Sequence, residues 1–146
     1  MMLPVLLVLL LGVIDVGRAV LLNKKTMGAA SIVADLLTRG ASVNNTEISD
    51  SLTAARMAID PYNRNLFGLD VASIQFQGVN ANPTVVWRQT FNMNPNPNVL
   101  SLAAGLGVQG EGVMIVTAHY VYHPVFLSVL TGDVPLQEVA VTRGRR

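Results

Sequence analysis

The sequence predicts an α+β protein, with a long apolar helix at the N-terminus, a second short helix and then about four strands. Three observations lead to this prediction. Residues 1–22, MMLPVLLVLLLGVIDVGRAVLL, are apolar except for Asp15 and Arg18. Apolar residues then recur at helical spacing as far as residue 59. After Pro61 the pattern changes to alternation with a period of two, which is typical of strands.

The apolar N-terminal segment decides where the protein works. A bilayer core about 30 Å thick takes roughly 20 helical residues to span, so residues 1–22 are long enough and residues 1–14 are not. Asp15 and Arg18 share a helical face, where they can pair, and Arg18 can extend toward the lipid surface. We expect a membrane anchor over residues 1–22 and an α+β domain over residues 23–146. A cleaved signal peptide and a buried core helix remain alternatives.

The first helix is expected to continue beyond the anchor to about Arg39. No proline interrupts residues 23–39, and Gly40 is a suitable residue to end a helix. This second half should be amphipathic. Its inward face is predicted from residues at helical spacing: Met27, Ala30, Val33 (or Ala34) and Leu37.

A second helix is expected between residues 45 and 60. Thr46 or Asn45 can cap it and Glu47 favours its first turn. Pro61 disfavours helical geometry at Asp60, so the helix should end before it. The apolar face consists of Ile48, Leu52, Ala55 and Ile59.

Four strands are expected in the remainder of the chain, over residues 68–77, 84–91, 112–123 and 134–143. The linker GVNANP between the first two predicts a hairpin. A short helical turn is expected over residues 99–106. Alternation predicts that Ala72, Ile74 and Phe76 share one face of the first strand. In the second strand it predicts one face with Val85, Trp87 and Phe91 and the opposite face with Val86, Arg88 and Thr90.

The residue types argue against an enzyme, a metalloprotein or a nucleic-acid-binding protein. The chain has no cysteine and a net charge of +1, which removes thiolate chemistry and a general basic surface. His119 and His123 lie about 13 Å apart if they share a strand, too far to bind one ion. The segment GLGVQGEG lacks the Gly-Lys-Ser/Thr of a phosphate loop. We predict no catalytic residue, cofactor, metal or small-molecule substrate.

The aspartates are expected to serve the local backbone. Asp50, Asp60, Asp70 and Asp133 are interpreted as residues of turns and helix ends.

The segment LPVLLVLLLGVIDVGRA, residues 3–19, resembles the leucine-rich signature of the TadE/TadG-like proteins of tight-adherence (Tad) pilus systems. The matching marks are Pro4, Asp15, Gly17 and Arg18. The stretch EGVMIVTAHYVYHPVF is similar to a family pattern in which a strand ends in aromatic-x-aromatic and proline. In this sequence those residues are Tyr120, Tyr122 and Pro124. The resemblance extends over nearly the whole chain.

The resemblance implies a pilin-like fold and a role as a minor pilin or pseudopilin in the assembly of Flp-type adhesion pili. It also implies a single-pass protein of the bacterial inner membrane, with an extracytoplasmic C-terminal domain that can be incorporated in the pilus. Its partners would be the membrane, other pilin-like subunits and components of the Tad secretion system. The alternative is a membrane-anchored extracytoplasmic binding or adhesion module outside any pilus.

The start of the sequence departs from the family pattern. Family members carry a basic leader and usually Glu-Phe-Ala upstream of the segment that matches residues 2–4. The cations that flank the C-terminal side of the apolar run, Arg18, Lys24 and Lys25, would by themselves favour a cytoplasmic C-terminal side. A basic leader upstream would account for this conflict.

We expect the working surface to be one face of the N-terminal helix. Val8, Leu11, Asp15 and Arg18 lie on that face and are predicted to contact the helices of partner pilins. Asp15 and Arg18 would supply polar contacts between helices.

Overall fold

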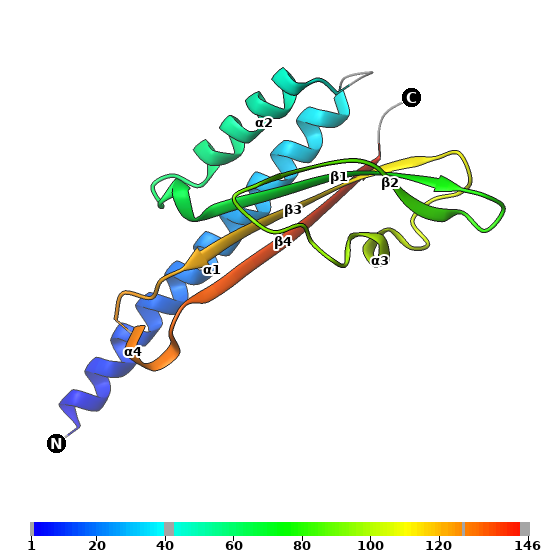
Figure 1. Ribbon diagram of the computed structural model, residues 1–146. Coiled ribbons are helices and arrows are strands. Elements are labelled where there is room, and N and C mark those ends of the chain that lie inside the picture. The colour runs from blue at the N-terminus through cyan, green and yellow to red at the C-terminus, as the bar shows by residue number, and fades with distance from the viewer. Residues whose placement is uncertain (1, 40–42, 127, 144–146) are drawn as a thin grey trace.

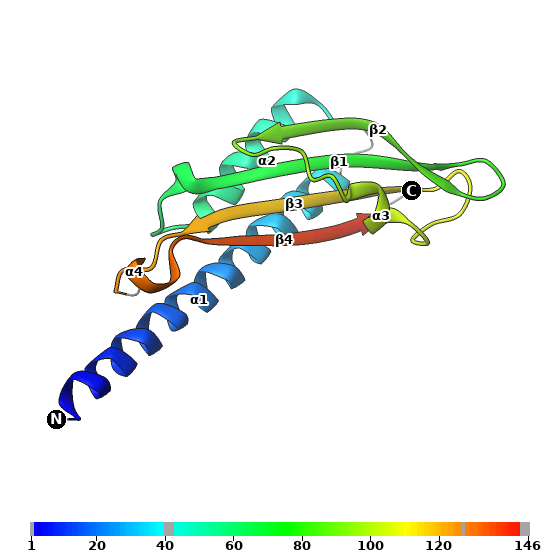
Figure 2. The ribbon, with the colours of Figure 1, turned by 60° about the horizontal axis from the view of Figure 1, so that its bottom comes forward.

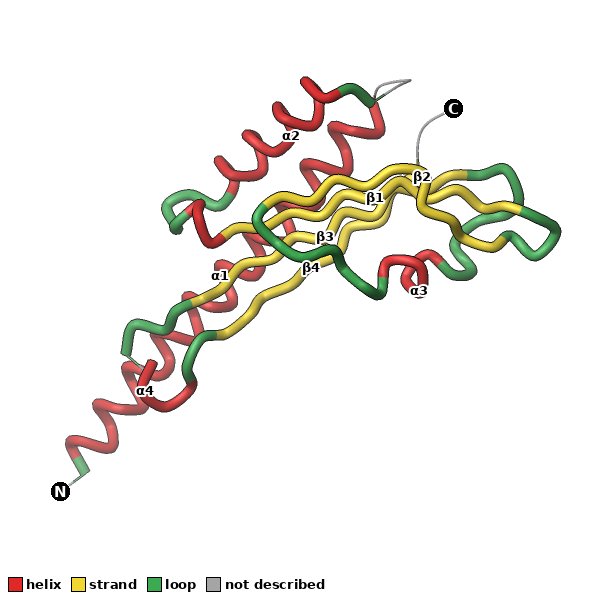
Figure 3. The backbone as a smooth tube through the Cα atoms, viewed as in Figure 1, coloured by secondary structure: helices red, strands yellow, loops and turns green. Residues whose placement is uncertain are grey.

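The computed structural model describes residues 2–39, 43–126 and 128–143. Four α-helices, one 3₁₀ turn and four strands make up this part of the chain (Figures 1 and 3). The architecture confirms the predicted α+β class. In chain order the elements are α1 (Leu3–Arg39), α2 (Asn45–Ala58), η1 (Arg64–Leu66), β1 (Phe67–Gln77), β2 (Asn82–Phe91), α3 (Val99–Ala103), β3 (Gly112–Tyr122), α4 (Ser128–Thr131) and β4 (Val134–Arg143).

The four strands form one antiparallel sheet in the order β2–β1–β3–β4. The hairpins β1–β2 and β3–β4 are joined through pairing of β1 with β3 at the centre. Helices α1 and α2 cover one face of the sheet, and the short helix α3 lies on the other face (Figure 2). Each face therefore has its own cluster of buried side chains.

The larger cluster lies between the sheet and the two long helices. It joins Leu22, Val33 and Leu37 of α1 with Ala55 and Ile59 near the end of α2 and with inward residues of β1 and β3. The smaller cluster lies beneath α3. It contains Ala72, Ile74, Phe76, Val99, Ala103, Val113 and Ile115. The predicted common face of Ala72, Ile74 and Phe76 is thus confirmed.

Helix α1 runs without a break to Arg39, as predicted, but one residue of its expected inward face was assigned wrongly. The buried stripe contains Leu22, Thr26, Ala29, Ala30, Val33, Ala34 and Leu37. Met27 is 47% exposed, because it follows the buried Thr26 and successive helical residues point about 100° apart.

Helix α2 begins one residue earlier than the predicted caps imply. Asn44 is the N-cap. Its side chain accepts the Glu47 N–H at 2.8 Å, and the Glu47 carboxylate accepts the Asn44 N–H at 3.0 Å. This reciprocal capping box satisfies two donors that the first turn would otherwise leave unpaired. The predicted apolar face and the end of the helix before Pro61 are confirmed.

A bulge in β2 overturns the predicted alternation of that strand. Ser73 pairs with Trp87, but the next residue of β1, Ile74, pairs with Val85. The extra residue shifts the register, so Val85 lies on the face of Ile74, opposite to Trp87 and Phe91. A sequence pattern with a period of two cannot represent such an insertion, and the grouping of Val85 with Trp87 was therefore wrong.

Candidate functional site on the N-terminal helix

The N-terminal third of α1 is an apolar helix that extends beyond the folded domain (Figure 1). Leu3 is 75% exposed, Val13 is 70% exposed, and residues 2–10 are all exposed. An 18-residue window of this helix has a mean hydropathy of 2.5 and is only 11% buried. Length and composition therefore suit a membrane span. The low burial is unlike that of a soluble core helix, which the sequence alone left as an alternative.

The folded domain first makes contact with this helix near Asp15. The side chain of Asp15 is only 2% exposed, although it lies on an otherwise apolar helix. Its carboxylate accepts the backbone N–H groups of Val125 at 3.1 Å and Phe126 at 2.8 Å. The phenol of Tyr122 donates to the backbone carbonyl of Asp15 at 3.2 Å. Asp15 thus fastens the connection between β3 and β4 to α1.

A buried carboxylate needs such donors, because removal of a charge from water is costly unless hydrogen bonds replace the lost hydration. The connection after β3 is suited to provide them. Pro124 precedes two residues whose N–H groups point at the helix, and α4 then lies beside α1 (Figures 1 and 2). Burial raises the pKa of the Tyr122 phenol, and the nearby Asp15 charge raises it further, while Arg18 opposes the rise.

The structure divides the four residues of the predicted helix face into two pairs. Val8 and Arg18 are exposed, and Val8 has 51% of its surface accessible. Leu11 is half-buried, and Asp15 is occupied by the chain's own β3–β4 connection. The role of all four residues in contacts between subunits stays a prediction, with Val8 and Arg18 as its accessible members.

Sequence reasoning did not connect Asp15 with Tyr122, Val125 and Phe126, which lie more than 100 residues away. A signal was nevertheless present. An acid within an apolar helix must find donors, and the aromatic-x-aromatic-proline pattern marks the end of the strand that supplies them.

Polar contacts farther along α1 fix its position on the domain. Asn23 donates to the Glu138 carboxylate of β4 at 2.7 Å. Lys25 donates to the backbone carbonyl of Ala58, the last residue of α2, at 3.4 Å and to that of Asp60 at 2.6 Å. With Asp15, these bonds hold α1 against the sheet edge at one point and against α2 at another. These contacts fix α1 on the domain from Asp15 to Lys25, and the exposed part continues the same helix toward the N-terminus.

Two of the aspartates assigned to turns and helix ends were assigned wrongly. Asp50 lies in the middle of α2. Asp70 belongs to a buried polar network on the opposite face of the sheet. This residue is not in a turn. It lies within β1, is 1% exposed and accepts two bonds from the Arg88 guanidinium, at 2.9 and 2.5 Å. Its carboxylate also accepts the Asn96 N–H, and the Asn96 side chain donates to Thr117. The hydrogen bond to Asp70 raises the pKa of Arg88. The network ties the loop before α3 to the sheet.

The two histidines lie on different segments and differ in exposure. His119 is half-buried on β3, whereas His123 lies beyond that strand and pairs with Asp133. Within residues 2–39, 43–126 and 128–143, no group of three or more His, Cys, Asp or Glu could hold a metal ion.

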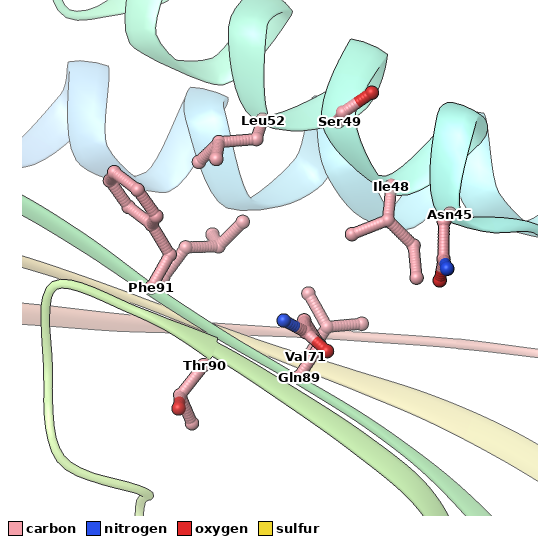
Figure 4. A pocket seen from close by; sticks show the side chains of 9 residues that line it. Asn45, Ile48, Ser49, Leu52, Val71, Gln89, Thr90 and Phe91 are labelled. Carbon is pink, nitrogen blue, oxygen red and sulfur yellow. The ribbon is translucent and has the colours of Figure 1, made fainter.

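A shallow groove of about 340 Å³ lies between α2 and the β1–β2 hairpin (Figure 4). Leu52 and Phe91 face each other across it, and Ile48 lies above Val71. None of the described residues that line it is charged. The full lining is Asn45, Ile48, Ser49, Leu52, Leu69, Val71, Gln89, Thr90 and Phe91. Its side chains suit apolar contact rather than acid–base or nucleophilic chemistry.

Comparison with known proteins identifies the N-terminal helix. The model of the TadE-like protein family matches residues 1–35, which include the exposed apolar part of α1, Asp15 and most of the buried stripe. No curated protein and no solved structure matches the chain significantly. The first 35 residues of the chain therefore match a TadE-like segment, which confirms the resemblance to the Tad pilus family that residues 3–19 showed in the sequence.

Proposed function

We propose that the protein is a non-enzymatic, pseudopilin-like component that assists the assembly of Flp/Tad-type pili used in surface adhesion. The N-terminal part of α1 would hold it in the bacterial inner membrane as a single span, with the α+β domain on the extracytoplasmic side. One observation carries the proposal. Residues 3–35 of the TadE-like match lie in one unbroken helix that is apolar and exposed at one end and is part of the domain core at the other.

The exposed end of α1 has two suitable environments. Lipid can cover its apolar side chains before assembly, and the helices of other pilin-like subunits can cover them within a filament. The outward side of the helix has small positions that suit close approach. A Cβ atom added at Gly17 or Gly28 would meet nothing within 4 Å. Exposed apolar residues continue beside them at Val20, Met27 and Ile32.

Deletion of the gene, followed by electron microscopy of the cells, tests the proposed role. We expect loss or strong reduction of pili and recovery when the wild-type chain is supplied. Normal pili in the deletion strain would refute the proposal. Normal pili with reduced adhesion would instead favour a membrane-anchored binding module, for which the groove beside α2 is the candidate surface.

Cysteine cross-linking tests the helix face, since the natural chain has no cysteine. Val8→Cys should form cross-links to pilin-like subunits in membranes of piliated cells. Val13→Cys is the matched control, because Val13 is exposed on the side of the helix that points away from Val8. Equal cross-linking at both positions would contradict a defined face. Arg18→Glu should reduce piliation, and intact piliation in that variant would count against a role for Arg18.

The orientation has its own test. Val79 lies at the tip of the β1–β2 hairpin and is 95% exposed. A single Val79→Cys variant should react with a membrane-impermeant maleimide in spheroplasts. Protection until the membrane is broken would place the domain in the cytoplasm.

A further inference from the structure

The connection between β3 and β4 carries apolar side chains at the point where α1 leaves the domain. Val125 is 57% exposed and Phe126 is 46% exposed, although both backbone N–H groups are bound to Asp15. Residues 124–132, PVFLSVLTG, contain no charged residue. Val125 and Phe126 therefore present apolar side chains to their surroundings while their backbone N–H groups are fixed to the helix.

These side chains continue the apolar surface of α1. Asp15 holds the connection, so Val125 and Phe126 lie beside the part of α1 where the apolar run of residues 2–14 ends. Helix α4 lies beside the same part of α1 (Figures 1 and 2). A membrane that surrounds α1 as far as Asp15 would therefore reach the connection as well.

The charged groups around the connection mark the position of the water boundary. On α1 the first exposed cation is Arg18, followed by the exposed Lys24. On the other side, His123 and Asp133 pair with each other where the connection leaves the strands. Apolar side chains thus lie toward the N-terminal end of α1 and ionic groups lie toward the sheet. This order suits an interfacial segment, where aromatic and aliphatic groups enter the lipid and cations reach the headgroups.

We propose that the β3–β4 connection is a second membrane contact, in which Val125 and Phe126 insert into the bilayer interface beside α1. The occupant is lipid. The contact rests on the proposed membrane insertion of α1, and it would fix the tilt and height of the domain above the bilayer. A helix alone leaves a domain free to rotate about one attachment, whereas two contacts define its orientation.

Site-directed fluorescence in proteoliposomes tests this contact. The full chain is reconstituted in vesicles of phosphatidylethanolamine and phosphatidylglycerol, with one introduced cysteine that carries an environment-sensitive fluorophore. The test position is Val125→Cys, which keeps the backbone N–H that binds Asp15. Val13→Cys is the lipid-exposed reference, and Val79→Cys, at the far end of the sheet, is the water-exposed reference. Spin-labelled lipids and aqueous iodide serve as quenchers.

We expect the probe at residue 125 to show blue-shifted emission, strong quenching by lipids labelled near the headgroup and weak quenching by iodide. The probe at residue 79 should show the opposite behaviour. If residue 125 behaves like residue 79 while residue 13 is quenched by lipid, the second contact is refuted and the anchor stands. If residue 13 is not quenched by lipid, the anchor itself fails. Protection of residue 125 from both quenchers would indicate a protein contact and would also overturn the proposal.

Discussion

Asp15→Ala is expected to release the β3–β4 connection from α1. The substitution removes the acceptor of two backbone N–H groups, at 3.1 and 2.8 Å. A hydrogen bond to a charged group contributes about 1.5–3 kcal/mol. Part of the combined contribution is offset, because the variant no longer has to desolvate a carboxylate that is 2% exposed in the wild type. We therefore expect the free energy that keeps the connection closed to fall by about 2–4 kcal/mol.

Hydrogen–deuterium exchange of the full chain in detergent measures this change. The amides of Val125 and Phe126 should exchange roughly 30- to 700-fold faster in Asp15→Ala, because each 1.4 kcal/mol corresponds to a factor of ten. Asp35→Ala is the matched control on the same helix. Asp35 forms an exposed pair with Arg39, and loss of such a pair costs less than about 1 kcal/mol. Wild-type exchange at both amides in Asp15→Ala would refute the assigned role of the carboxylate.

Three other perturbations test the domain itself. Arg88→Ala leaves the buried Asp70 without its ion pair and should lower the free energy of unfolding by about 3–5 kcal/mol in urea denaturation. The fold raises the pKa of Tyr122, so the stability that this residue contributes is present below pH about 10 and is lost as the pH rises through the pKa of the folded state. Absorbance at 295 nm measures the ionisation of the phenol, and unfolding at each pH measures the loss of stability. Gly107→Ala would place a Cβ atom 2.2 Å from the Phe76 ring and should cost about 1–3 kcal/mol, measured by thermal unfolding.

Each of these has a control. Asp60 pairs with Arg64 at the surface, so Arg64→Ala should leave the free energy of unfolding in urea nearly unchanged. An equal loss of stability in Arg64→Ala and Arg88→Ala would contradict the argument that burial makes the Asp70–Arg88 pair the more important one. Tyr122→Phe should reduce the alkaline loss of stability, and an unchanged loss would assign it to other groups. Gly28→Ala, which meets no neighbouring atom, should stabilise the helix by about 0.5–1 kcal/mol. If Gly28→Ala destabilised the protein and Gly107→Ala did not, the space assigned to a Cβ atom at these two positions would be wrong.

The sequence was sufficient to predict α1, α2, α3 and the four strands, because their signals are local, but it did not predict the short elements η1 and α4. Proline-free helical spacing predicted α1 as far as Arg39, and the turn residues between β1 and β2 predicted the hairpin. The errors arose where distant residues decide the outcome. The bulge opposite Ser73 places Val85 on the face of the sheet opposite to the predicted one. The burial of Asp70 depends on Arg88 from β2 and on Asn96 from the following loop.

The candidate site was predictable only on the helix. High hydropathy predicted the apolar part of α1 that the structure leaves exposed. The position of Asp15 within this apolar sequence indicated that its carboxylate needs hydrogen-bond donors. Neither shows what satisfies that requirement. The donors come from the β3–β4 connection, and their arrival beside Asp15 is a result of the strand order and of the length of β3.

The unbroken course of α1 has a mechanical consequence. The domain contacts the helix at several points from Asp15 to Leu37: Asp15 is bonded to the β3–β4 connection, Asn23 to β4 and Lys25 to the end of α2 and Asp60. A force that pulls the N-terminal end along its axis therefore loads these contacts in parallel, as shear, rather than peeling them apart one by one. The domain is thus built to follow its helix under tension instead of being stripped from it.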